Sequence, residues 1–389
     1  MHTAISQIRK LSAWRPYKLG QSVRHKKILY LAHGDSIGGG QRQLLYLIEN
    51  LDRRLYEPLV VCPTDGRFAD ALTRLGAKVF VCPLHPWRKF PALLYRYFDA
   101  QRLVRYASEH NVSLIHCSNL WLSGYMHYLA ARLKVPSILH VRTPLCPRDV
   151  RKHRCDKTDI VIAISSRVKR DLLQGGVCEE KIAQIDDGVD VRLFQPNGNG
   201  NVLAQDYPAS GDLRIGIAGR VCEAKRQLDF LKAAEAIRES VNKKISFFVI
   251  GNYNLGKYYR RLRNFVESNG LNGNVFFTGE RQDMPEVLTS LDVLVSLSGG
   301  SVMFEAMSCG TPVVSAGFTS YENSVHLQDG RTGLLVPSRH TADLVKAIRT
   351  LLESGSLRNT ISRQAREWAV LNLNHQKLVR CTQQLYDGL

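Results

Sequence analysis

The 389-residue sequence lacks a long apolar run. Its longest uncharged stretch, residues 111–131, is interrupted by polar side chains such as Ser118 and His127. Such a stretch is too polar for a membrane-spanning helix. The first 27 residues are basic but have no continuous apolar core, so we expect no secretion signal. We therefore expect a cytoplasmic chain, with any membrane contact peripheral and on the inner face of the cytoplasmic membrane.

Paired cysteines are also missing. The nine cysteines occur singly, no CxxC motif is present, and several lie in apolar runs where cysteine behaves as a small hydrophobe. These features indicate a reduced chain rather than a disulfide framework. The segment from Cys146 to Cys155 contains His153, but four suitably spaced zinc ligands are absent, so we expect no metal there.

Several nucleotide- and nucleic-acid-binding signatures are absent. Neither half of the chain has a G-x-G-x-x-G sequence after its first predicted strand, which argues against a dinucleotide-dependent dehydrogenase. Gly38, Gly39 and Gly40 lie between a predicted strand and helix and could cradle an anion, but the P-loop lysine is missing. RNP, zinc-finger and helix-turn-helix patterns are missing too, so a nucleic-acid-binding protein rests on charge alone.

Charge of one sign is in excess. Lysine and arginine total 53 against 35 acidic residues, a net charge of +18. Residues 1–190 hold 30 basic and 17 acidic residues, so this half carries most of the excess. Such asymmetry indicates an anionic partner, although a merely soluble basic surface is the alternative. Residues 1–25 have the spacing of an amphipathic helix for a lipid surface or are a frayed basic tail.

Short apolar runs alternate with helical patterns throughout the rest of the chain. This alternation predicts an α/β protein with mostly parallel sheets covered on both faces. A polar segment around Asn197–Asn201 interrupts the pattern, which then restarts. We expect two Rossmann-like, doubly wound domains facing a cleft. The expected parts are a basic arm (1–25), an N-terminal domain (26–190), a linker (191–212), a C-terminal domain (213–370) and a last helix (371–389) that crosses back to the N-terminal domain.

Residues 298–312 hold the densest candidate site. They follow a predicted buried strand and read S-G-G-S-V-M-F-E-A-M-S-C-G-T-P. Gly299, Gly300 and Ser301 allow a ligand to approach the backbone at the start of a short helix, where N–H groups attract negative charge. Glu305 lies one turn into this helix, and Gly310 ends it. An ordinary strand–helix corner with a solvated glutamate is the alternative.

A second candidate follows the first predicted strand of the C-terminal half. Gly219 and Arg220 come directly after that strand, and Lys225 is five residues further on. Arginine offers a planar fork and lysine a point charge, so together they can hold a diphosphate. Two solvated surface cations are the alternative.

These motifs resemble those of retaining, family 4 type glycosyltransferases with the GT-B fold (glycosyl transferases group 1). Residues 219–225 resemble the family's G-R-x-x-x-x-K element, and residues 304–314 resemble its EAMxxGxPVV element. Residues 185–196 are similar to its N-G-V-D…F-x-P hinge. The resemblance extends over about residues 26–370 with the motifs in the family's order.

The resemblance implies a nucleoside-diphosphate-sugar donor and no required metal, because fixed cations and helix-start amides can stabilise the leaving diphosphate. It implies that Arg220 and Lys225 hold the diphosphate and that Glu305 binds the ribose. His140, at a predicted strand end, matches the family's histidine beside the transferred sugar. The implied donor-binding residues are Gly39, Arg220, Lys225, Gly299, Gly300, Ser301 and Glu305.

One position departs from the family pattern. A first glutamate usually stands eight residues before the second and contacts the transferred sugar, but Leu297 occupies that position. The departure leaves two alternatives: an unusual donor, or a non-catalytic relative acting as a scaffold in glycan assembly. We expect a glycosyltransferase acting with retention on a lipid-linked or envelope glycan, for example in lipopolysaccharide or other polysaccharide biosynthesis. The basic, aromatic stretch from Trp87 to Arg105 favours an acceptor at an anionic membrane surface.

Overall fold

The computed structural model describes residues 25–389 except 35–36, 89–92, 197–200, 209–210, 212, 241–243 and 317–324. The amphipathic arm predicted for residues 1–25 therefore lies almost wholly outside the described residues. The chain divides into two compact units. The first unit comprises Met1–Asp186 and Gln376–Leu389, and the second comprises Asp187–His375.

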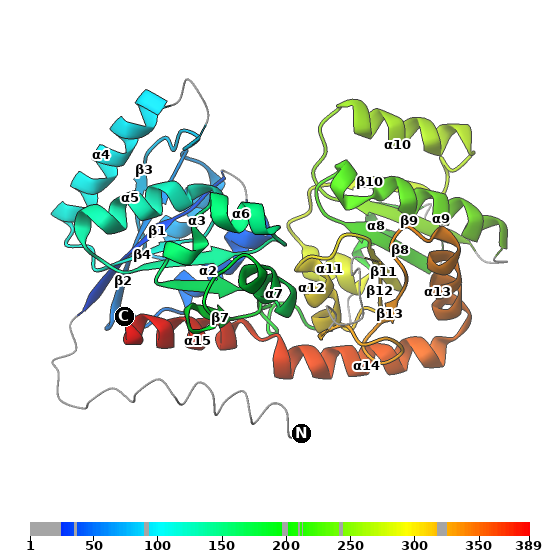
Figure 1. The fold of residues 1–389 in the computed structure, drawn as a ribbon. Helices are drawn as coiled ribbons and strands as arrows, with labels where there is room; N and C mark the ends of the chain where they lie inside the picture. Colours follow the sequence, from blue (N-terminus) through cyan, green and yellow to red (C-terminus); the bar gives the residue numbers. More distant parts are fainter. Residues whose placement is uncertain are drawn as a thin grey trace. The chain divides into compact units, whose positions relative to one another are not determined.

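The first unit, which holds the strands labelled β1–β4 and β7 in Figure 1, contains a seven-stranded parallel sheet. The strand order is β3-β2-β1-β4-β5-β6-β7. Its strands are β1 (Lys26–Leu31), β2 (Tyr56–Cys62), β3 (Lys78–Val81), β4 (Leu114–Cys117), β5 (Ser137–Val141), β6 (Ile160–Ala163) and β7 (Ile182–Gln184). Its α-helices are α2 (Gly39–Glu49), α3 (Arg67–Arg74), α4 (Leu93–Glu109), α5 (Ser123–Leu133), α6 (Pro147–Lys152), α7 (Ser166–Gln174) and α15 (His375–Gly388), the last starting one residue before the unit boundary.

Two apolar cores cover the two faces of this sheet, because successive strand side chains point to opposite sides. In β1, Leu29 and Leu31 face the core that includes α4, α5 and α7. Ile28 and Tyr30 face the core that includes α2, α3 and α15. The last helix of the chain thus covers the same sheet face as the first described helices.

The second unit contains a six-stranded parallel sheet in the order β10-β9-β8-β11-β12-β13. Its strands are β8 (Leu213–Ala218), β9 (Ile245–Ile250), β10 (Val275–Gly279), β11 (Val293–Ser296), β12 (Val313–Ser315) and β13 (Leu334–Leu335). Its α-helices are α8 (Val202–Asp206), α9 (Gln227–Ser240), α10 (Lys257–Ser268), α11 (Met284–Thr289), α12 (Val302–Cys309), α13 (Thr341–Glu353) and α14 (Gly355–Asn372). Leu203 of α8 is fully buried against α11, so part of the expected linker is packed into this unit.

Both sheets have the strand order of a doubly wound fold, which confirms the predicted fold class. The order reverses between β1 and β4 in the first sheet and between β8 and β11 in the second. Open α/β sheets bind ligands at such switch points, beyond the carboxyl ends of the strands. Each unit therefore has one topologically favoured site.

Within the described residues, no helix is both long and apolar enough to span a bilayer.

Candidate functional site

The switch point of the second unit is where both sequence motifs meet. Gly219 follows β8 with a φ of 134°, a backbone conformation that glycine adopts readily. Arg220 follows and is exposed, and Lys225 ends a short 3₁₀ turn, η4 (Glu223–Lys225). Burial lowers the pKa of Lys225, and the Arg220 charge acts in the same direction. An anion bound here would relieve the repulsion between these cations.

The loop after β11 lies against this lysine. Gly299 and Gly300 have φ values of 68° and 121°, so both need glycine's conformational freedom. A Cβ built on Gly300 would lie 3.5 Å from Lys225 Nζ, which places the glycine turn directly beside the ammonium. Ser301 then occupies the N-cap position of α12. The turn thus brings a cation and a helix start together, a combination suited to phosphate oxygens.

Glu305 occupies the first turn of α12 and is only 5% exposed. The helix ends, as predicted, at Gly310, which has a φ of 74° and the left-handed conformation of a helix C-cap. Thr311 then donates its hydroxyl to Leu288 O at 2.7 Å, which anchors the chain as it turns into β12. Glu305 therefore occupies a buried position on a short helix that is anchored at its C-terminal end.

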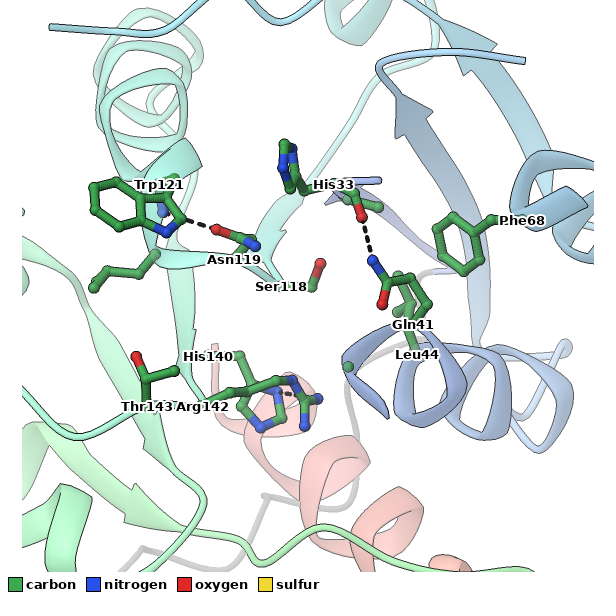
Figure 2. A pocket seen from close by; sticks show the side chains of 13 residues that line it. His33, Gln41, Leu44, Phe68, Ser118, Asn119, Trp121, His140, Arg142 and Thr143 are labelled. Carbon is green, nitrogen blue, oxygen red and sulfur yellow. Dashed lines mark hydrogen bonds between the residues drawn. The ribbon is translucent and has the colours of Figure 1, made fainter. Parts of the chain in front are cut away.

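The switch point of the first unit contains a pocket of about 110 Å³ (Figure 2). Its lining residues lie at or just after the carboxyl ends of β1, β4 and β5 or on the nearby helices α2 and α3. They are Ala32, His33, Gly40, Gln41, Leu44, Phe68, Ser118, Asn119, Leu120, Trp121, His140, Arg142 and Thr143. The indole of Trp121 is 65% exposed, so an aromatic face is accessible at this site. Sugar rings and other flat, partly apolar groups bind such faces.

His140 is the predicted catalytic histidine, and it lies on β5 with only 3% exposure. Arg142, a residue without an assigned role in the sequence, donates from Nη2 to His140 Nδ1 at 3.3 Å (Figure 2). Burial, reinforced by the charge of Arg142, holds the pKa of His140 well below its usual range. His140 is therefore neutral, with Nδ1 as the acceptor and the proton on Nε2.

Gly39 is the first residue of α2 and is exposed. A Cβ on the next residue, Gly40, would lie 3.4 Å from Arg142 Cδ, so the start of α2 lies beside this arginine. The first unit thus brings Gly39, His140 and Arg142 to one end of its sheet. The second unit separately brings together Arg220, Lys225, Gly299, Gly300, Ser301 and Glu305.

Comparison with known families agrees with this arrangement. Residues 204–368 match the model of glycosyl transferases group 1, and residues 37–193 match that of glycosyltransferase family 4. The chain belongs to the family 4, group 1 glycosyltransferases. The two matches cover both units, and the first includes every motif of the second switch point.

Solved structures of low sequence identity share the fold. The Anabaena protein HepE, in complex with UDP and glucose, is 21% identical and has a TM-score of 0.82 over 94% of this chain and all of its own. A glycosyltransferase from Rickettsia africae is 16% identical and has a TM-score of 0.79 over 93% of this chain and 98% of its own. The fold is therefore that of the GT-B glycosyltransferases, as the sequence predicts.

Curated relatives match over part of their length. An uncharacterized glycosyltransferase from Methanocaldococcus jannaschii is 24% identical over 60% of this chain and 59% of its own. A D-inositol 3-phosphate glycosyltransferase from Paenarthrobacter aurescens is 30% identical over 46% of this chain and 45% of its own. The chain thus spans about half the length of these relatives.

The structure explains the departure from the family 4 pattern at Leu297. This side chain is 2% exposed and belongs to the apolar core that β8, β11 and α9 share. Its backbone oxygen accepts a hydrogen bond from Arg226 Nη1 at 3.1 Å, and Arg226 also pairs with Asp229 at 2.8 Å. Leu297 therefore belongs to the core, and its side chain has no polar group to offer a ligand.

Sequence reasoning missed several residues of the first switch point. The sequence alone assigns no role to Arg142, Asn119 or Trp121. His116 and Tyr386, which lie behind His140, were also missed. The signal for His116 was its place at the end of an apolar strand, parallel to the strand that carries His140. No local signal marked Tyr386, since only the tertiary fold brings it to the sheet.

Proposed function

We propose that this chain transfers a sugar from a nucleoside-diphosphate sugar to an acceptor with retention of configuration. The observation that carries the proposal is the second switch point, where Arg220, Lys225 and the Gly299–Gly300 turn follow adjacent strands. Departure of a nucleoside diphosphate concentrates negative charge on the phosphate oxygens, and fixed cations with helix-start amides stabilise that charge. The HepE complex with UDP and glucose supports a donor of this class.

The residues have distinct proposed roles. Arg220 and Lys225 hold the diphosphate, and Glu305 accepts hydrogen bonds from the ribose hydroxyls. The amides of Gly299, Gly300 and Ser301 bind phosphate or sugar oxygens. In the first unit, Gly39 contacts the donor's pyrophosphate and His140 contacts the transferred sugar. The sugar-binding glutamate of the family has no counterpart at Leu297, so recognition of the sugar rests on other groups.

The acceptor is proposed to be a glycan, lipid-linked or part of the cell envelope, at an anionic membrane surface. Tyr95, Tyr97 and Phe98 of α4 are 59%, 55% and 64% exposed. Tyr95, Phe98, Arg102 and Arg105 recur at helical spacing, which places aromatic and basic side chains on one face. Such a face suits the boundary between headgroups and acyl chains.

Thermal unfolding with a panel of nucleoside diphosphates and their sugars tests the donor proposal. A ligand at 100 times its Kd stabilises a folded protein by about 2.7 kcal/mol. We expect one nucleotide series to raise the Tm, and Arg220→Ala to remove that rise. Arg260→Ala, at an exposed position of α10, is the matched control and should retain the rise. A panel without any stabilising ligand would overturn the donor site.

A scaffold that binds the donor without transferring its sugar is the second candidate, and the absence of the family's first glutamate favours it. Hydrolysis of the nucleotide-sugar distinguishes the two functions. A transferase releases nucleoside diphosphate slowly even without acceptor, whereas a scaffold releases none. We expect slow release that depends on Arg220 and Lys225.

A further inference from the structure

Behind His140, a second histidine is buried on the neighbouring strand. His116 lies on β4 and is 1% exposed. The rings of His116 and His140 are stacked, with centroids 5.8 Å apart and planes 22° apart. Both Nε2 atoms are buried and have no hydrogen-bond partner among the described residues. Because no hydrogen bond from these residues holds either Nε2 atom, each imidazole keeps a single orientation only if a partner holds its Nδ1 atom.

The Nδ1 atom of His116 is fixed by the last helix of the chain. It lies 2.6 Å from the hydroxyl of Tyr386 on α15, and this hydroxyl lies 3.1 Å from that of Tyr30 on β1. Tyr30 and His116 are register partners in adjacent strands. Lys26 Nζ also donates to Tyr386 O at 2.6 Å. Tyr386 is fully buried, so its hydroxyl is shielded from solvent and forms its hydrogen bonds within this network.

We propose that Tyr386 and His116 are positioning residues for His140. Tyr386 fixes the His116 ring, the His116 ring packs against His140, and Arg142 fixes the other side of His140 through Nδ1. The Nε2 proton of His140 is thereby held in one direction. The proposal rests on the proposed function of His140 at the transferred sugar, and it makes α15 a structural part of the active site.

The packing explains why both sides are needed. An imidazole held by one hydrogen bond can still swing about that bond, and a misplacement of about 1 Å can cost a reaction about 100-fold. Arg142 alone supplies one such bond to His140. The stacked His116 ring blocks the swing, but only while Tyr386 keeps His116 itself from rotating.

Tyr386→Phe tests this proposal, and Tyr56→Phe is its matched control. The hydroxyl of Tyr56 donates to Asp387 Oδ1 on the same helix, but no hydrogen bond links it to His116. Both variants therefore remove one tyrosine hydroxyl that anchors α15 to the sheet. Only Tyr386→Phe removes the hydroxyl that fixes His116.

The first readout is independent of catalysis. Nitrogen-detected NMR of the histidine rings, assigned with His116→Gln and His140→Gln, reports the tautomer and environment of each ring. We expect His140 to carry its proton on Nε2 and its ring signals to shift in Tyr386→Phe but not in Tyr56→Phe. Unchanged His140 signals in Tyr386→Phe would overturn the proposal, even if the chain proved not to be a transferase.

The second readout is nucleotide-sugar hydrolysis together with donor-induced thermal stabilisation. We expect Tyr386→Phe to lower kcat about 10-fold or more while the donor-induced rise in Tm stays, because donor binding rests mainly on the second unit. An equal loss of kcat in Tyr56→Phe would mean that α15 affects catalysis only by packing on the sheet, and would overturn the proposal. If Tyr386→Phe fails to fold, His116→Phe replaces it, since this variant keeps a ring but removes both nitrogens.

Discussion

The two switch points are built in different ways. In the second unit, the site comes from two short segments, residues 219–225 and 299–305, each following a strand end. In the first unit, it comes from side chains scattered along the chain, from His33 to Tyr386. A site built on a backbone turn is recognisable as a compact sequence motif, because glycine and charged residues must occur at fixed spacings. A site formed by tertiary packing corresponds only to single residues with no sequence pattern around them.

The two switch points also differ in the charge and exposure of their side chains. Arg220 is exposed, whereas His116 and His140 are buried and neutral. The second unit places an exposed arginine and a partly buried lysine at its switch point. The first unit places a buried, neutral histidine in the lining of a pocket that also has an exposed tryptophan. This contrast predicts that substitutions in the second unit act mainly through phosphate charge, and that those in the first act through orientation.

The largest effect is expected for the cation pair. Arg220→Ala and Lys225→Ala should each lower kcat about 100- to 1,000-fold, the loss typical when a group that stabilises developing charge is removed. Release of nucleoside diphosphate measures this effect, with Arg260→Ala as the control. Full activity in both variants would contradict the role of phosphate charge in the second unit, since that unit would then hold no charge-stabilising site.

A large effect on stability is expected at Leu297, which directly follows β11. Leu297→Glu restores the family's carboxylate but places it in the apolar core, so we expect a loss of about 3 kcal/mol or more in the free energy of unfolding. Ser298→Glu, at the adjacent exposed position, is the matched control. Denaturant unfolding measures both. A stable and more active Leu297→Glu variant would show that this position faces the sugar after all.

Much of the fold was predictable from the sequence, for reasons visible in particular residues. Apolar runs such as Ile28–Leu31 are typical of buried parallel strands. Gly310 marked the end of α12. These signals are local, because each reflects a backbone conformation or one face of a sheet.

The rest depended on tertiary packing. The core position of Leu297 follows from the path of the chain after β11, and the sequence shows only an apolar residue there. Tyr386 reaches His116 because α15 returns to the first unit, 270 residues further along the chain. Such contacts depend on the assembled sheet rather than on any neighbouring residue.

A moderate effect is expected on acidification. Burial lowers the pKa of His116 to about 3 and that of His140 in the same direction. Both rings stay neutral in the folded chain but gain protons in the unfolded chain below about pH 6.5. Their contribution to stability is therefore complete above that pH and is lost as the pH falls towards 3.

At pH 5, His116 alone should cost about 2 kcal/mol of stability relative to pH 8. Denaturant unfolding at the two pH values measures this loss, and His116→Gln should reduce it by that amount. An equal pH dependence in the variant and the wild type would mean that His116 is accessible to protons in the folded chain.

The smallest effect is expected on the surface of α4, which tests whether the first unit also uses charge and apolar area at a membrane. Phe98→Ser removes an exposed aromatic ring from a face that includes Arg102 and Arg105. One partly buried aromatic ring contributes about 1–2 kcal/mol to interfacial binding, so we expect a roughly 5- to 30-fold weaker association. Co-sedimentation with vesicles containing an anionic lipid measures it, and Leu371→Ser, at an exposed position of α14, is the matched control.

Equal binding by both variants and the wild type would remove α4 as the membrane contact. Loss of binding in high salt without any loss in Phe98→Ser would attribute the contact to basic residues alone, since only the electrostatic part of such binding is screened.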